Sequence, residues 1–182
     1  MILCITVFVF ITMIASFSLS QVYAEPIIYD DDYIVEKFAT GLEYPTTMAF
    51  VGEDILVLEK NTGKIIRIQD SGVIYNEHVL DVPVMATYEG GLLGITSVLN
   101  HVYLYFTESL SGFDNTDILF GEIENSKNSV YRYDWNGENL TNPILIKELP
   151  AIHASHHGGV IAIGLNDEIY FVIGDQDQHT TF

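Results

Sequence analysis

Ile152–Asp175 reads IHASHHGGVIAIGLNDEIYFVIGD, and this stretch decides the fold class. Its two apolar runs, Val160–Ile163 and Ile169–Ile173, are β-branched and aromatic, and Asn166-Asp167 between them supplies turn chemistry. Runs of this kind around a polar turn predict a β-hairpin. Because hairpin strands are antiparallel, the entry to the first strand and the exit from the second lie at one sheet edge. The sequence therefore predicts that His156 and Asp175 meet.

A histidine beside a carboxylate is suited to general-base chemistry. The imidazole titrates near neutral pH, and the carboxylate fixes its tautomer and stabilises the imidazolium that forms. A structural interpretation stays open, because Asp and Asn are common turn residues at strand ends and loop histidines are often solvated. Spacing alone does not decide between the two.

The composition predicts one folded, acidic domain. The chain has 182 residues, of which 48% are apolar, and its net charge is −18. This apolar content can bury a core, which argues against disorder. With 7 Lys plus Arg against 25 Asp plus Glu, binding to a nucleic acid backbone or to an anionic membrane surface is electrostatically unfavourable.

Residues 1–24 predict a signal peptide and hence a secreted or extracytoplasmic protein. Met1–Ala24 lacks Asp, Glu, Lys and Arg, and it ends Val22-Tyr23-Ala24 before Glu25-Pro26, with the smaller Val22 and Ala24 at the expected cleavage site. An uncleaved membrane anchor is the alternative, since the apolar run is long enough to enter a bilayer. Cys4, the single cysteine of the chain, lies in this segment, so the mature chain cannot form an internal disulfide.

The rest of the chain repeats the hairpin theme. Residues 25–40 form an expected linker with a strand at Tyr33–Phe38, and residues 41–182 form an expected single domain. Three hairpins are expected in it, each ending on an acid: Thr47–Val51 with Ile55–Glu59, Leu92–Leu99 with Val102–Glu108, and Val160–Leu165 with Glu168–Asp175. Third and fourth strands are expected at Lys64–Gln69 and His78–Val82 after the first hairpin, and at Val130–Trp135 and Ile144–Glu148 after the second.

Four antiparallel strands that recur at about fifty residues predict an all-β fold of the β-propeller type. The chain would supply about two and a half blades, with Ser109–Asn128 as an inserted loop. Since propellers close with about four to eight blades, the strands at Glu168–Ile173 and Tyr33–Phe38 would be exposed edges. Such edges predict pairing between copies of the chain.

Three motifs together resemble the glucose/sorbosone dehydrogenase family. They are Gly41–Phe50, the Glu89–Gly94 stretch EGGLLG, and His156-His157-Gly158-Gly159 followed by Gly174-Asp175-Gln176. The resemblance covers the chain from Gly41 onward. It implies part of a six-bladed β-propeller that oxidises the anomeric carbon of aldose sugars to lactones, with pyrroloquinoline quinone (PQQ) as cofactor and an external electron acceptor.

The resemblance also implies roles for three residues. His156 matches the histidine that takes the proton from the anomeric hydroxyl, and His157 takes the variable position behind it. Asp175 matches the carboxylate that orients this base, and Glu89 matches a substrate acceptor. Val160 departs from the family pattern, in which a basic residue often follows the second glycine. Calcium is implied as well, but the calcium ligands and most cofactor ligands of relatives come from later blades, so no metal ligand and no cofactor ligand is assigned.

Two other interpretations stay open. A zinc or copper site could form from His153, His156, His157 and His179 with Asp175, since imidazoles and carboxylates suit such ions. The chain could also be a truncated, inactive propeller fragment that serves as an extracellular binding module. Glu89 as a solvated turn residue is the corresponding structural interpretation of the EGGLLG motif.

Overall fold

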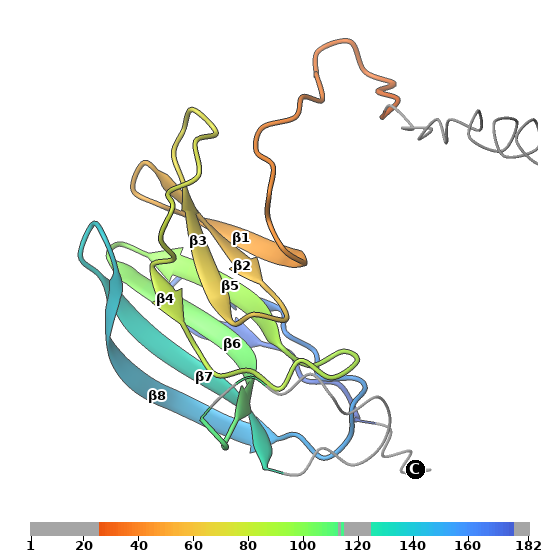
Figure 1. The fold of residues 1–182 in the computed structure, drawn as a ribbon, viewed down its shortest axis with the longest axis vertical. Helices are drawn as coiled ribbons and strands as arrows, with labels where there is room; N and C mark the ends of the chain where they lie inside the picture. The colour runs from red at the N-terminus through yellow and green to blue at the C-terminus, as the bar shows by residue number, and fades with distance from the viewer. Residues whose placement is uncertain (1–25, 113, 115–124, 177–182) are drawn as a thin grey trace, which may run out of the picture. The chain divides into compact units, whose positions relative to one another are not determined.

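A computed structural model describes residues 26–112, 114 and 125–176. The chain divides into two units, Met1–Lys37 and Phe38–Phe182, and the fold lies in the second. That unit contains two four-stranded antiparallel sheets and one two-stranded sheet (Figure 1). The signal peptide predicted at residues 1–24 lies outside the described residues, as does most of the predicted insertion.

Each four-stranded sheet is a meander in which sequence neighbours pair. The first consists of β1 (Pro45–Val51), β2 (Asp54–Glu59), β3 (Lys64–Ile68) and β4 (Leu80–Asp81). The second consists of β5 (Leu92–Val98), β6 (His101–Ser109), β7 (Ser126–Trp135) and β8 (Leu140–Pro150). A hairpin of β9 (Ile161–Ile163) and β10 (Ile169–Phe171) follows.

The three sheets pack in sequence because β6 buries both of its faces. Side chains alternate along a strand, so Val102, Leu104 and Phe106 enter the core shared with the first sheet. Tyr105 points the other way and packs with Val130 and Ile161 against the hairpin. The first strands of the three sheets are neighbours, since β5 contacts both β1 and β9. The second sheet is therefore the middle layer.

The structure confirms the three predicted hairpins. At the turn of the third, Asp167 has a φ of +59° and the Gly164 amide donates to the Glu168 carbonyl. The fourth strands differ in length from the prediction. β4 has only two residues. β8 is longer than predicted and begins at Leu140. It can include Pro143, which has no amide to donate, because the pairing of β7 with β8 shifts register at that point.

The strand predicted at Tyr33–Phe38 is wrong. The described residues before β1 contain no strand, and Tyr33, Ile34 and Val35 are all exposed. Alternating apolar and charged residues form a strand only where a partner strand is available. Within the ranges that the structure describes there is also no helix long and apolar enough to cross a membrane.

Candidate functional site

The loop between β8 and β9 carries His156, and the segment after β10 carries Asp175. The Nδ1 atom of His156 lies 2.6 Å from Oδ1 of Asp175, and both side chains are about half exposed. The hairpin geometry thus brings together the pair expected from the sequence. Asp175 accepts the Nδ1 proton, so Nε2 is the ring nitrogen that carries the lone pair of the neutral base.

Glu89 joins the pair from the loop that precedes β5. Its Oε2 atom accepts a hydrogen bond from the backbone amide of His156 at 2.5 Å. Its own amide donates to the Ala154 carbonyl at 3.1 Å, so the two loops bond in both directions. The three residues proposed for the site from sequence, Glu89, His156 and Asp175, therefore lie in one cluster.

Glycines let the loops approach closely. A Cβ at Gly174 would collide with the carbonyl oxygen of His156 and would lie 2.8 Å from its Cβ. Gly159 has a φ of +113°, and a Cβ there would lie 2.6 Å from Leu93 Cβ. These positions need glycine because neighbouring atoms already fill the space of a side chain. His156 itself has a left-handed φ of +59°, which is uncommon for a residue with a Cβ.

The structure separates the roles of the two adjacent histidines. His157 is 1% exposed, and its Nδ1 lies 3.0 Å from Oδ1 of Asn128. Asn128 donates its Nδ2 to the Pro150 carbonyl, so Oδ1 is the acceptor and His157 is the donor. Burial lowers the pKa of His157 to about 4, opposed by the charge of Glu89 and by backbone hydrogen bonds. His157 is a neutral anchor of the loop.

Two further side chains fix this anchor. The Tyr105 hydroxyl, fully buried on β6, donates to the His157 carbonyl at 2.7 Å, and Thr107 Oγ1 donates to Asn128 Oδ1 at 2.9 Å. Burial raises the pKa of Tyr105, which keeps its hydroxyl protonated as a donor. The loop with His156 is thereby tied to the middle sheet.

Lys60 is the cation that reaches the Glu89 loop. Its Nζ donates to the Tyr88 carbonyl at 2.9 Å and to Asn61 Oδ1 at 3.3 Å. Burial lowers the pKa of Lys60, and the negative charge of Glu89 partly offsets this. The Lys60 carbonyl also accepts the amide of Leu92 at 2.9 Å, so the residue holds the loop at both ends.

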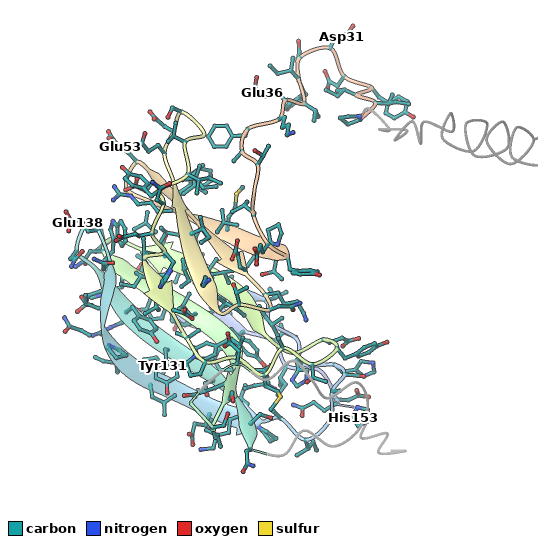
Figure 2. All side chains as sticks on the ribbon, viewed as in Figure 1. Asp31, Glu36, Glu53, Tyr131, Glu138 and His153 are labelled. Carbon is teal, nitrogen blue, oxygen red and sulfur yellow. The ribbon has the colours of Figure 1, made fainter. Side chains whose placement is uncertain are left out.

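The alternative zinc or copper site is not assembled in the part of the chain that the structure describes. No group of three or more His, Cys, Asp or Glu side chains there is placed to hold a metal ion. His153, labelled in Figure 2, lies on the same loop as His156. His157, another expected ligand, is instead buried against Asn128. His179 lies outside the described residues.

Sequence reasoning missed the residues that support the site. Asn128, Lys60 and Gln176 were given no role, although Gln176 stands in the motif Gly174-Asp175-Gln176. Gln176 is 4% exposed, and its Oε1 accepts a hydrogen bond from the amide of Ile152, at the start of the loop that carries His156. A glutamine directly after a site carboxylate was the available signal, whereas Asn128 and Lys60 lie far from the motif in sequence and gave none.

Comparison with known proteins gives consistent matches. A family model described as "Glucose / Sorbosone dehydrogenase" matches residues 42–181. Quinoprotein glucose dehydrogenase B of Acinetobacter calcoaceticus is 31% identical over 135 residues, which cover 69% of this chain and 27% of the relative. The chain thus spans about a quarter of the length of this curated relative.

Solved structures agree with the sequence match. The PQQ-bound aldose sugar dehydrogenase of Streptomyces coelicolor has a TM-score of 0.62 and 28% identity over 80% of this chain and 42% of its own. An oxidoreductase of Thermus thermophilus, described as a glucose dehydrogenase, has a TM-score of 0.64 and 26% identity over 79% of this chain and 41% of its own. This chain spans about two fifths of each solved relative.

Proposed function

Since the chain belongs to the glucose/sorbosone dehydrogenase family, we propose that it provides the catalytic base of a quinoprotein that oxidises the anomeric carbon of aldose sugars to lactones. The observation that carries this proposal is the His156–Asp175 pair, with its 2.6 Å contact between Nδ1 and Oδ1. A base of this kind is what removal of a proton from a sugar hydroxyl requires.

In the proposed reaction, Nε2 of His156 takes the proton from the anomeric hydroxyl. As the O–H bond breaks, a hydride leaves the anomeric carbon and the carbon–oxygen bond becomes the carbonyl of the lactone. Asp175 keeps the Nδ1 proton in place and stabilises the imidazolium. PQQ, when bound, supplies the two-electron acceptor, and an external acceptor then removes the electrons.

Glu89 is proposed to accept a hydrogen bond from the substrate. Its Oε2 holds the His156 amide, and a carboxylate has further lone pairs for a sugar hydroxyl. The same carboxylate would thereby set the position of both the substrate and the base. Effective positioning of this kind is a large part of catalysis.

The residues around the site fit an anionic quinone in part. Lys60 is half-buried beside the Glu89 loop, where a cation would favour the carboxylates of PQQ. This chain matches only part of the length of its relatives. We expect the remaining PQQ contacts and the calcium ion in the part that it does not match. Calcium stays an expectation from the resemblance.

The proposed architecture is part of a six-bladed β-propeller. The two four-stranded meanders would be complete blades, and β9 with β10 would be the first half of a third. Support comes from the contacts of β5 with β1 and β9, since first strands of consecutive blades surround a propeller axis. We propose an extracytoplasmic location from the predicted signal peptide.

A cofactor titration tests the function. The purified chain is titrated with PQQ and calcium, followed by absorbance, and then given aldoses with an artificial electron acceptor. We expect His156→Ala to lose sugar oxidation while cofactor affinity stays nearly unchanged. The matched control is His101→Ala, which removes another histidine, paired with Asp134 at 2.9 Å at the start of β6.

Each outcome has a defined meaning. Turnover that is equal in wild type and His156→Ala would remove His156 from the mechanism. Cofactor binding without turnover would favour the alternative of an inactive extracellular binding module. If the chain is folded but does not bind PQQ, the proposal that this chain functions on its own would be contradicted.

A further inference from the structure

The loop between β8 and β9, which carries His156, begins at a carbonyl oxygen that accepts hydrogen bonds from two buried amide side chains. The Pro150 oxygen, at the end of β8, receives Asn128 Nδ2 at 2.8 Å and Gln176 Nε2 at 2.5 Å. Gln176 Oε1 in turn accepts the amide of Ile152 at 2.8 Å. Gln176 therefore uses both ends of its amide where β8 passes into the loop, on the last residue of β8 and on Ile152.

Gln176 also directly follows Asp175. Its two hydrogen bonds thus link the carboxylate end of the pair to the start of the loop that carries His156. The His156 and Asp175 side chains are 46% and 50% exposed. Exposed pairs hold their own geometry weakly, so a fixed geometry depends on buried neighbours. Gln176, at 4% exposure and with a φ of +52°, is such a neighbour.

We propose that Gln176 is a positioning residue that holds Asp175 against Nδ1 of His156 and so keeps the lone pair of the base on Nε2. It acts through Asp175 and the loop, not on the substrate. The significance for sugar oxidation depends on the function proposed above, whereas the effect on the imidazole concerns the chain alone.

The test reads the protonation of the His156 ring directly, without cofactor or substrate. Long-range ¹H–¹⁵N NMR distinguishes the two neutral tautomers of each histidine. We expect wild type to show the Nδ1–H tautomer at His156 where the ring is neutral. In Gln176→Leu both side-chain hydrogen bonds are lost, and we expect the ring to shift toward the Nε2–H tautomer with a changed titration midpoint.

A second variant keeps the size of the side chain. Gln176→Glu retains an oxygen for the Ile152 amide, but it replaces the donor to the Pro150 carbonyl by an ionised oxygen, so the hydrogen bond is lost and a negative charge is added. We expect the same change of tautomer. Gln69→Leu is the matched control, because Gln69 donates to the exposed Tyr75 hydroxyl away from this loop. It should leave the His156 ring unchanged.

A merely structural role would lower the melting temperature without altering the tautomer. Wild-type tautomer and titration of His156 in folded Gln176→Leu, or in Gln176→Glu if the leucine variant does not fold, would overturn the proposal. If the chain is active with PQQ, both variants should lower kcat by about tenfold or more with little change in KM. If the wild-type chain does not oxidise sugars, the proposed function fails, but the NMR experiment still tests the role of Gln176.

Discussion

The Nδ1 atom of His156 and the Oδ1 atom of Asp175 lie 2.6 Å apart although 19 positions separate the two residues. The hairpin β9–β10 spans that separation and returns the chain to its starting edge. The contact fixes which ring nitrogen of His156 carries the proton, and this in turn decides which nitrogen can act as a base.

Gly174→Ala should displace His156. The added Cβ would collide with the His156 carbonyl and approach its Cβ to 2.8 Å, and main chain cannot move aside cheaply. We expect a loss of about 1 to 3 kcal/mol in the free energy of unfolding and a weakened His156–Asp175 contact. Urea denaturation and the NMR signals of the His156 ring measure the two effects.

Gly164→Ala is the control for this substitution. Its Cβ would approach the ring of Tyr170, which is exposed and can rotate away. We expect near wild-type stability and an unchanged His156 ring. Equal effects of the two alanine variants would contradict the steric argument for Gly174.

His157 should make the fold sensitive to acid. Burial lowers its pKa from the ordinary value of 6.5 to about 4 in the folded chain, so the unfolded chain binds more protons between these two values. Stability therefore falls as pH is lowered from about 6.5 to about 4, by on the order of 2 to 3 kcal/mol. Urea denaturation across this range measures the slope.

His157→Asn isolates this contribution. Asparagine can donate to Asn128 Oδ1 from the position of Nδ1 but does not titrate. The variant should be less stable at pH 7 because a cavity remains, and its stability should fall less steeply toward pH 4. A slope equal to that of wild type would show that other groups cause the acid sensitivity.

Lys60→Met should loosen the Glu89 loop. It removes the charged donor to the Tyr88 carbonyl, a bond that we expect to contribute about 1 kcal/mol at this half-exposed position. Hydrogen exchange at the amides of Glu89 and Leu92 should be faster by about fivefold. Lys147→Met, on the exposed strand β8, is the control and should leave these amides unchanged.

The free edge of the third sheet should support association between copies of the chain. Among the described strands β10 pairs with β9 alone, and Tyr170 on β10 and Val172 directly after it are exposed. We predict concentration-dependent association in light scattering, and Val172→Lys should reduce it because a charge opposes edge pairing. Val73→Lys, at an equally exposed valine between β3 and β4, should have no effect.

The hairpins were predictable because their evidence is local. β-branched runs, alternation and a polar turn all lie within about twenty residues, and the position of His156 near Asp175 follows from antiparallel pairing. The extent of β8 was not predictable in this way. Pro143 marks a strand boundary in the sequence, but the irregular pairing with β7 accommodates it.

The support of the site was less accessible to sequence reasoning. The sequence does not show which of two adjacent histidines is buried, because this depends on Asn128 and Tyr105 in other strands. In the same way, Tyr33–Phe38 has a strand-like pattern, yet no partner strand is present in the described part of the chain. The local sequence pattern shows which secondary structure a segment can form. Contacts with residues distant in sequence decide whether the segment forms it.

The close glycine contacts have a consequence for protein engineering. At Gly158 and Gly174 the space of a Cβ is filled by main chain of the opposite segment, and at Gly159 by the Cβ of Leu93. The path of the loop on either side of position 156 is therefore fixed by the close contacts at these glycines. A designed catalyst on this loop would keep the three glycines, and its residue at position 156 would have to adopt the left-handed φ of +59°.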